Sequence, residues 1–290
     1  MTVVLAAVLF VFIIVLWMAK QTADPYGDFH LSLNKLSDEK ILRTEWINMG
    51  YWKDTDVFPK ACEELALKLV QVAGCKPGAK VLDVGHGSGE SLIFLLTHPS
   101  VPRPSHITGI TSLPLHFQRS QARIARLSPA VPVVLHPGDA IYRPGAALDH
   151  PFSPSSDRFD MVLALDCAYH FRPRVEFLRQ AFSALDRGGS IALADICFVP
   201  GALQTRWTQW VTTVLRLMPH ENLISTDEYF AQMHDIGYTD LWLENITDEV
   251  FPGFIRFLET RGVGWRLFGA VLRMYWRAGA QFVLVRGTRR

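Results

Sequence analysis

Residues 80–90 read K-V-L-D-V-G-H-G-S-G-E, and this stretch decides the fold. The letters V-L-D-V have the largely apolar character of a buried strand. Glycines follow at alternate positions, at Gly85, Gly87 and Gly89, and an apolar run over 91–96 predicts a helix directly after them. A glycine turn between a strand and a helix N-terminus is typical of nucleotide binding, because the backbone can approach a ligand closely and the first helical N–H groups are free.

The spacing of the glycines narrows the class of nucleotide. The pattern is G-x-G-x-G, whereas dinucleotide sites have G-x-G-x-x-G, and the Gly-Lys-Ser/Thr of a P-loop is missing. Asp83 places a carboxylate near the carboxyl end of the strand, which suits a cationic or amine-bearing ligand better than a pyrophosphate. A nicotinamide-dependent oxidoreductase is therefore the less favoured alternative.

At these residues the chain resembles the class I S-adenosylmethionine (SAM) dependent methyltransferases, whose first motif reads roughly V-L-D-x-G-x-G-x-G. The resemblance implies an α/β, Rossmann-like sheet of seven mostly parallel strands, the last one antiparallel, with SAM as cofactor. It assigns cofactor contacts to Asp83, Gly85, His86, Gly87 and Gly89, and it implies that Gly85, His86 and Gly87 hold the methionine end of SAM. The matching strands are predicted at 81–84, 106–111, 131–135, 159–165, 191–194, 238–244 and 281–286.

Two further motifs follow the second and third strands. The second strand ends in G-I-T, which resembles the tocopherol, sterol and cyclopropane-fatty-acid type methyltransferases, where a Gln five residues after the Thr contacts the cofactor. His116 stands at that position here, so the resemblance leaves Thr111 or His116 to take the ribose. Gly138, Asp139 and Ala140 follow the third strand and resemble the element that reads the adenine amine. An ordinary turn is the alternative.

Chemistry is expected directly after the fourth strand, because ligands lie at the carboxyl ends of the strands in α/β sheets. The sequence there is D-C-A-Y-H-F, from Asp166 to 171. In the same subgroup an acidic residue and a His occur here four apart, which Asp166 and His170 match. We expect His170 to act as a general base oriented by a carboxylate, with Tyr169 beside it. Holding the substrate or the backbone is the alternative.

Aromatic residues before and after this region are candidates for contacts with the cofactor and the substrate. Tyr51 and Trp52 resemble a segment that closes over SAM, whose sulfonium an aromatic face attracts; packing of a helix on the core is the alternative. Trp207 and Trp210 share one face of a predicted helix. This spacing indicates either an apolar lid over the substrate or packing in the core. His220 is a weaker candidate for a polar substrate contact.

The amino end predicts a membrane anchor. Residues 1–19 carry no charge, and the apolar run over 3–18 is near the lower limit for a bilayer span of about 17–25 residues. A signal peptide is the alternative, but no basic segment precedes the run. We predict an anchor at 1–19, a linker at 20–36 and a methyltransferase domain at 37–290 that begins with a helix near 37–46. Lys20 after the run places this domain in the cytosol, at the endoplasmic reticulum in a eukaryote.

Composition limits the partners. The formal net charge of +1 over 290 residues offers no global attraction for nucleic acid. The four cysteines show no C-x-x-C spacing, so they predict a reducing compartment and neither a disulfide framework nor a metal site. Arg266, Arg273 and Arg277 share a face of an aromatic-rich helix, which indicates either a membrane-surface contact or an ordinary solvated face.

Together these features predict a membrane-anchored SAM-dependent methyltransferase acting on an apolar small molecule or lipid, such as a sterol, a terpenoid or a prenylated quinol. Because the methyl group of a sulfonium is already electrophilic, the main tasks of the enzyme are positioning and desolvation. A membrane-tethered SAM-binding scaffold without catalysis is the alternative. The sequence leaves open whether carbon, nitrogen or oxygen is methylated, and the oligomeric state.

Overall fold

The computed structural model describes residues 27–35, 42–145 and 149–290. The anchor predicted at 1–19 lies outside these ranges. Within them, no helix combines the length and the apolar character that crossing a membrane requires.

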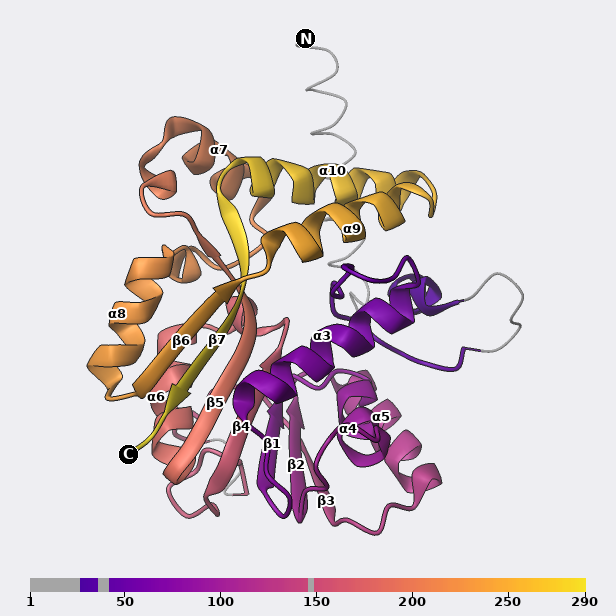
Figure 1. Cartoon of the computed structure of the whole chain (residues 1–290), viewed down its shortest axis with the longest axis vertical. Helices are drawn as coiled ribbons and strands as arrows, with labels where there is room; N and C mark the ends of the chain where they lie inside the picture. The colour runs from indigo at the N-terminus through magenta and orange to yellow at the C-terminus, as the bar shows by residue number, and fades with distance from the viewer. Residues whose placement is uncertain (1–26, 36–41, 146–148) are drawn as a thin grey trace.

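A seven-stranded sheet forms the centre of the described chain (Figure 1). Its strand order is β3-β2-β1-β4-β5-β7-β6, and β7 runs antiparallel to both of its neighbours while the other pairs are parallel. The predicted α/β Rossmann-like sheet is thereby confirmed. The strands are β1 (Lys80–Val84), β2 (His106–Thr111), β3 (Val133–Pro137), β4 (Phe159–Leu165), β5 (Leu185–Phe198), β6 (Thr239–Asn245) and β7 (Ala280–Thr288).

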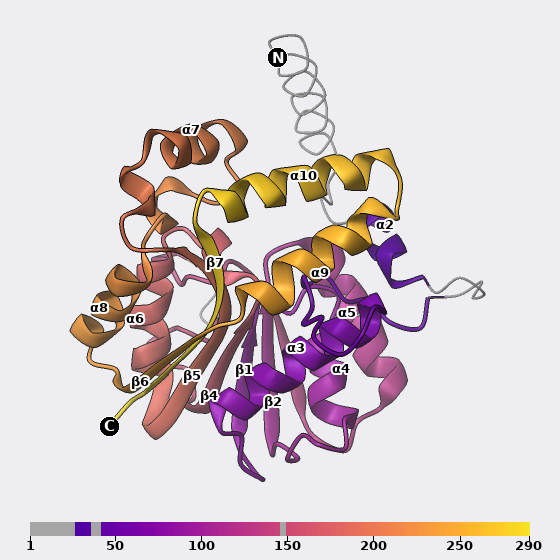
Figure 2. The ribbon, with the colours of Figure 1, turned by 45° about the horizontal axis from the view of Figure 1, so that its top comes forward.

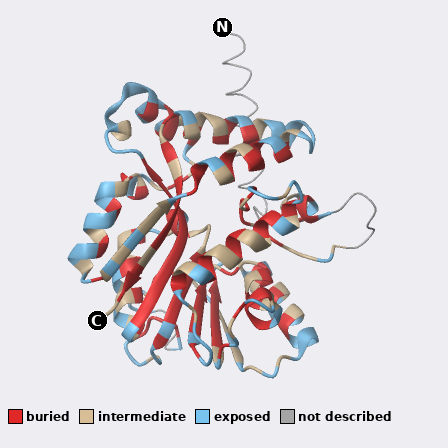
Figure 3. Cartoon of the chain, viewed as in Figure 1, coloured by how far each residue is buried: buried red, intermediate tan, exposed pale blue. Residues whose placement is uncertain are grey.

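Helices cover both faces of the sheet, so the central strands are buried on both sides (Figures 1 and 3). Successive strand residues point to opposite faces, so that Val81 and Leu163 belong to one apolar core while Leu82 and Val162 belong to the other. This two-sided burial explains why the strands read as continuous apolar runs. One face carries α3 (Phe58–Ala73), α4 (Glu90–Thr97) and α5 (Pro114–Leu127); the other carries α6 (Arg174–Ala184) and α8 (Thr226–Ile236).

A further layer of helices lies beyond the carboxyl ends of the parallel strands (Figures 1 and 2). It contains α7 (Arg206–Leu215), α9 (Thr247–Glu259) and α10 (Val263–Arg277), with α10 packed against both α9 and α7. The buried face of α10 includes Trp265, Val271 and Tyr275, whereas Arg266 and Arg277 are exposed. This layer places apolar helices over the edge of the sheet where a ligand is expected.

The chain before α3 differs from the prediction. The described part of the helix expected near 37–46, residues 42–46, is not helical, because its backbone bonds to distant side chains instead. The Asn34 side chain accepts from Trp46 N at 2.8 Å and donates to Trp46 O at 2.9 Å. The predicted linker also contains two short helical turns, α2 (Asp28–Leu31) and η1 (Ser32–Asn34), and Leu33 on the second is buried in the core.

Trp52 fixes this N-terminal segment to the helical layer. Its indole lies among Phe58, Phe254 and Phe257, with the Trp52 and Phe257 ring centroids 5.2 Å apart. The indole N–H donates to Met49 O at 2.7 Å, which satisfies its only polar group inside the core. This geometry favours core packing for Trp52 over a contact with the cofactor.

We expect Gly253→Ala to destabilise the domain by about 1–3 kcal/mol, because overpacking a filled core forces its neighbours to move. A Cβ at Gly253 would lie 2.2 Å from Trp52 Cβ. Gly269→Ala is the matched control, since it is also a buried helical glycine but its new Cβ would find its nearest neighbour at 3.6 Å. This control is expected to be neutral or stabilising. Urea unfolding measures both; equal effects would contradict the packing described for Trp52.

Candidate active site

The strand order reverses between β1 and β4, and this reversal locates the site. From β1 the chain continues outward through β2 and β3, whereas β4 pairs with β1 on its opposite side. The loops that leave the two strands therefore diverge at adjacent carboxyl ends, and a crevice between such loops is the usual ligand site of open α/β sheets. The predicted glycine loop and the predicted Asp166 to His170 segment are these two loops.

The two loops touch at Gly85. Its φ of 81° lies in the left-handed region that favours glycine. A Cβ at this position would lie 2.7 Å from Cys167 Sγ, and that thiol in turn donates to Val84 O at 3.2 Å. Gly85 is therefore required both by the turn and by the close approach of the β4 loop.

A third wall comes from the segment 45–52, which lies across both loops. Met49 N donates to Asp166 Oδ2 at 2.7 Å, and Ser88 Oγ donates to Glu45 O at 2.8 Å. Ile47 lies so near the glycine loop that a Cβ at Gly87 would be 3.0 Å from its Cδ1. The backbone of this segment thus lies over the glycine loop, where its contacts come from residues that precede Tyr51 and Trp52. Because these contacts are made largely by backbone atoms, the sequence carried no signal for them.

Charged side chains hold the same segment in place. Arg119 Nε lies 2.6 Å from a carboxylate oxygen of Glu45, and Arg123 pairs with Glu90. Glu45 N also donates to Glu90 Oε2 at 2.6 Å. Sequence reasoning missed these roles. The arginines, four residues apart on α5, were the available signal, although a solvated helix face carries the same spacing.

Tyr51 belongs to this wall, and it packs against the core without being fully buried in it. It is half-buried, and Lys68 Nζ lies 5.4 Å from the centre of its ring. Burial raises its pKa, and the nearby Glu249 raises it further. The contact between the Tyr51 ring and Lys68 does not prevent the ring from also contacting the sulfonium of SAM. The contact of Tyr51 with SAM therefore stays a prediction.

Asp166 carries the most perturbed carboxylate of the site. Its backbone has a φ of 57°, unusual for a residue other than glycine, and Oδ1 is buried without a hydrogen-bond partner in the described chain. Burial raises the pKa of Asp166 to about 8, against smaller lowering by the Met49 amide and the Tyr169 hydroxyl. Among the described residues, neither a hydrogen bond nor an ion pair joins Asp166 to His170, so the expected orientation of the imidazole by this carboxylate is not formed.

His170 ends the short helical turn η2 (Ala168–His170) and is exposed. Its ring centroid lies 4.2 Å from that of Tyr169, which limits its rotation. Desolvation by the surrounding atoms lowers the pKa of His170 to about 4, with a smaller lowering from Arg172. Water reaches this exposed residue and weakens the desolvation, but the direction leaves the imidazole neutral near pH 7. A neutral, accessible imidazole can accept a proton.

A buried polar network holds the loop that carries His170. Asn222 Nδ2 donates to the carbonyls of Tyr169 and Phe171, at 2.8 and 2.6 Å, one on each side of His170. Asn222 Oδ1 accepts from Arg174 N at 2.9 Å. The Arg174 guanidinium donates to Asp195 Oδ2 at 2.8 Å, and this oxygen also accepts from the Tyr229 hydroxyl at 2.7 Å. His170 is therefore positioned from β5 through Asn222.

The predicted adenine element lies beside a hollow at the end of β3. Gly138 N donates to Thr111 O at 3.0 Å, which joins the ends of β2 and β3. Asp139 is exposed, and its Oδ1 accepts from Ile141 N at 3.0 Å, while Ala140 is buried. The hollow has a volume of about 380 Å³, within the range of small-molecule sites. Its lining includes His136, Pro137, Gly138, Asp139, Ile141, Arg143, Asp149 and His150.

The histidines predicted near the methionine and ribose are buried. His86 packs against Gly109, where an added Cβ would lie 2.7 Å from the imidazole. Desolvation lowers the pKa of His86 to about 4, and its Nε2 has no hydrogen-bond partner among the described residues. His116 and Thr111 are also buried, and His116 Nδ1 lies near Gly87. Their contacts with the ribose stay a prediction.

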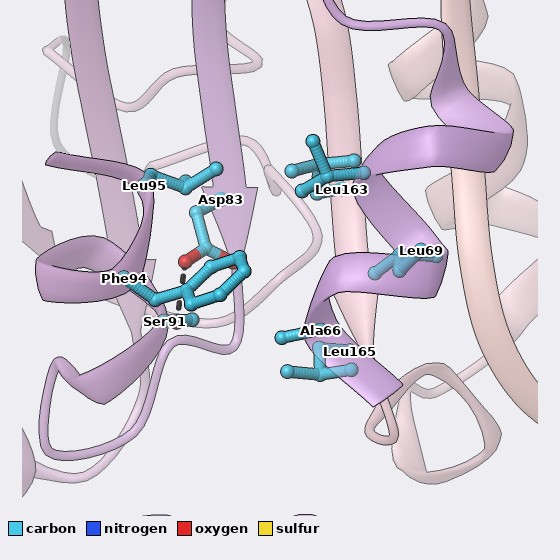
Figure 4. A pocket seen from close by; sticks show the side chains of 9 residues that line it. Ala66, Leu69, Asp83, Ser91, Phe94, Leu95, Leu163 and Leu165 are labelled. Atoms are coloured by element: carbon cyan, nitrogen blue, oxygen red, sulfur yellow. Dashed lines mark hydrogen bonds between the residues drawn. The ribbon is translucent and has the colours of Figure 1, made fainter. Parts of the chain in front are cut away.

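Asp83 points to the α3 and α4 side of the sheet (Figure 4). Its Oδ2 accepts from Ser91 Oγ at 2.6 Å, and burial raises its pKa to about 6. The apolar hollow beside it, with a volume of about 10 Å³, has room for at most one water molecule. The described role of Asp83 is therefore to tie the first turn of α4 to β1. This hollow is lined by Ala66, Leu69, Val70, Asp83, Ser91, Phe94, Leu95, Leu163 and Leu165.

The residues predicted to contact the substrate lie at the surface. Trp207 and Trp210 stack with ring centroids 5.5 Å apart and are 47% and 37% exposed, so they do not form core. The buried face of α7 contains Val211 and Leu215 instead. His220 is exposed two residues before Asn222, on the loop bonded to the His170 segment. Their roles in substrate binding stay predictions.

The chain matches a known protein family and is similar in sequence to several characterised proteins. A family described as "Methyltransferase domain" matches residues 51–242. The chain is 28% identical over 253 residues to erythromycin 3''-O-methyltransferase of Saccharopolyspora erythraea, covering 83% of this chain and 78% of that protein. It is 27% identical over 248 residues to 27-O-demethylrifamycin SV methyltransferase of Amycolatopsis mediterranei, covering 83% and 84%.

The fold is similar to that of geranyl diphosphate C-methyltransferase from Streptomyces coelicolor, with a TM-score of 0.62 and 17% identity. The match covers 81% of this chain and 82% of that one, which was solved with S-adenosyl-L-homocysteine. At this identity the likeness concerns the fold, which hosts many different activities.

We expect Asn222→Ala to loosen the His170 loop, because two buried carbonyls lose their donor and each unsatisfied group costs about 1–3 kcal/mol. Amide hydrogen exchange should accelerate in 168–171 more than in β5. Asn245→Ala is the matched control, since Asn245 is exposed and bonds locally to Thr247. If exchange in the loop were unchanged in the Asn222 variant, the network would not position His170.

Proposed function

Because this chain belongs to the methyltransferase domain family, we propose that it transfers the methyl group of SAM to a hydroxyl oxygen of an apolar small molecule. SAM-dependent methyl transfer is the activity of this family, and structures of geranyl diphosphate methyltransferase, which has a similar fold, contain SAM or its demethylated product. The choice of oxygen rests on His170, which is exposed, held between two fixed carbonyls and favoured in its neutral form. A hydroxyl must lose its proton to become a good nucleophile, and a neutral imidazole can take it.

The names of the similar proteins support the same choice. Erythromycin 3''-O-methyltransferase and 27-O-demethylrifamycin SV methyltransferase are both named for methylation at oxygen. We therefore propose a hydroxylated natural product as the substrate class. Sterols, terpenoids and prenylated quinols are the narrower candidates, supported by the apolar helices α7, α9 and α10 beyond the strand ends.

The residues of the site fit SAM as cofactor. The glycine loop allows close backbone approach, and the hollow at Asp139 can take a ring that donates an amine hydrogen bond. When bound, SAM supplies an electrophilic methyl group on a sulfonium. A ring nitrogen of His170 accepts the hydroxyl proton of the substrate, Asn222 fixes the backbone on both sides of His170, and segment 45–52 keeps water from the loops.

We expect His170→Ala to lower methyl transfer by about 10²- to 10⁴-fold, the usual contribution of a general base, while SAM affinity stays unchanged. The assay uses methyl-labelled SAM with a panel of hydroxylated macrolides, terpenols, sterols and prenylated quinols, followed by mass analysis. His234→Ala, an exposed histidine on α8, is the control. Unchanged turnover in the His170 variant would remove it from the reaction.

The pH profile is a second readout of this prediction. A base with a lowered pKa is neutral above that pKa, so its activity persists at neutral pH and is lost only as the pH falls through the lowered value. At saturating SAM, the rate of the wild-type protein should therefore remain level down to about pH 6, below which an ordinary histidine would already be charged. A fall centred near pH 6.5 would contradict the lowered pKa. Label transfer to none of the panel, with SAM binding intact, would favour the scaffold alternative.

We also propose that residues 1–19 hold the protein at a membrane with the catalytic domain in the cytosol, on the strength of their uncharged, apolar composition. Leu9→Arg in the middle of the run should release the full chain from carbonate-washed membranes, because a charge at the centre of a span costs about 2.5–3.5 kcal/mol. Leu9→Ile is the matched control and should stay with the membranes. Release of the wild-type chain itself would rule out the anchor.

A further inference from the structure

We propose that the Asp166 carboxylate is the counter-ion of the α-ammonium group of SAM, and not the partner of His170. The inference rests on the proposed function only in taking SAM as the cofactor. It is independent of which substrate is methylated and of whether His170 acts as a base.

The position of Asp166 supports this assignment. It directly follows β4 and precedes Cys167, whose Sγ packs against Gly85. Met49 N, from the segment that lies across both loops, donates to its Oδ2 at 2.7 Å. The carboxylate therefore lies where the glycine loop, the β4 loop and segment 45–52 meet, next to the loop to which the resemblance assigns the methionine end of SAM.

The second carboxylate oxygen of Asp166, Oδ1, lacks a hydrogen-bond donor among the described residues. Asp166 Oδ1 is buried and has no hydrogen-bond partner within the described ranges, although buried polar atoms in proteins are almost always paired. An unpaired buried acceptor costs about 1–3 kcal/mol. The left-handed backbone of Asp166, with a φ of 57°, adds strain of the kind that concentrates at ligand sites. A feature this costly indicates that a ligand completes it.

Within residues 27–35, 42–145 and 149–290, no cation pairs with Asp166. The titratable groups that interact with it are Tyr169 from η2, Asp195 from β5, Cys62 from α3 and its neighbour Cys167. None of these is a cation, and Asp195 already pairs with Arg174. No ion pair to Asp166 occurs among the described residues. By contrast with Asp195, a charged Asp166 finds no counter-ion among the residues that the structure describes.

The α-ammonium group suits this role better than the sulfonium. An ammonium carries up to three N–H donors, so it can both neutralise the carboxylate and donate to the unpaired Oδ1. A sulfonium has no N–H or O–H and would leave that oxygen without a hydrogen bond. The choice between the two positive groups of SAM therefore follows from the orphaned acceptor.

The proposed ion pair between Asp166 and the ammonium group of SAM can be measured by the proton that Asp166 releases when SAM binds. In the free protein, burial keeps Asp166 protonated near neutral pH, since its pKa is raised to about 8. An α-amino group has a pKa of about 7.7–8.0, so SAM brings the ammonium form below that pH. Forming the ion pair ionises Asp166 and releases its proton to solvent. SAM affinity should then rise with pH from 6 to about 7.5, and fall above about 8 as the ammonium loses its proton.

Calorimetry of the full chain at about pH 6.5, in buffers of different ionisation enthalpy, counts the protons released on binding. SAM and S-adenosylhomocysteine, which both carry the ammonium, should each release about one proton. Methylthioadenosine, which has neither positive group, should release none. Release with SAM alone would assign the carboxylate to the sulfonium and overturn the proposal, as would equal release with all three ligands or no release with any.

Asp166→Asn tests the residue itself. The amide oxygen can still accept from Met49 N, so the loop is kept while the charge is removed. We expect this variant to bind SAM at least tenfold more weakly without proton release, whereas Asp235→Asn at the exposed end of α8 should match the wild type. Full release from the Asp166 variant would overturn the proposal. If the variant fails to fold, the wild-type buffer series still decides.

The proposed methyl transfer and the proposed role of Asp166 can be contradicted independently of each other. Proton release with S-adenosylhomocysteine, but no label transfer to any panel substrate, would retain the role of Asp166 and remove only the proposed reaction. Label transfer to a hydroxyl without proton release would retain the reaction and overturn the role of Asp166.

Discussion

The close approach of the loops after β1 and β4 is the constraint on which the rest of the site depends. Gly85 has room for no side chain, because Cys167 occupies the space where its Cβ would lie. Asp166 N donates to Ala194 O at 2.9 Å, and Gly85 N to Ile110 O at 2.8 Å, so each loop is also bonded to a neighbouring strand. The sheet therefore sets the shape of the site, and the flanking segments adjust to it.

Two carboxylates near this junction, each with a buried oxygen, differ in how completely they are paired. Asp195 is fully paired, with the Arg174 guanidinium and the Tyr229 hydroxyl on one of its oxygens, and it anchors the loop of His170 through Asn222. Asp166 lies one strand away, and among the described residues one of its oxygens is unpaired and no ion pair reaches it. In a low-dielectric interior the first arrangement is stable by itself, whereas the second leaves the unpaired acceptor from which we infer the bound ammonium group.

Much of the fold could be predicted because its signals are local. All seven strands were located, although the fifth was predicted only at 191–194 and β5 spans Leu185–Phe198. The glycine spacing at Gly85, Gly87 and Gly89 located the nucleotide turn. The extended path of residues 42–57 could not be predicted, since it is held by bonds from Met49 N and Glu45 N to carboxylates far along the chain. A backbone N–H is present in almost every residue, so such bonds leave no mark in the residue pattern.

By itself, the sequence determined the sheet, the glycine turn and the set of polar residues that follow the fourth strand, because each depends on neighbours in the chain. The tertiary structure decided how those residues are partnered. It placed Met49 rather than His170 on Asp166, put Trp52 in the core and joined Asn222 to the His170 loop. Spacing along a chain cannot encode these choices, because the partner of a buried group is set by which distant segment packs against it.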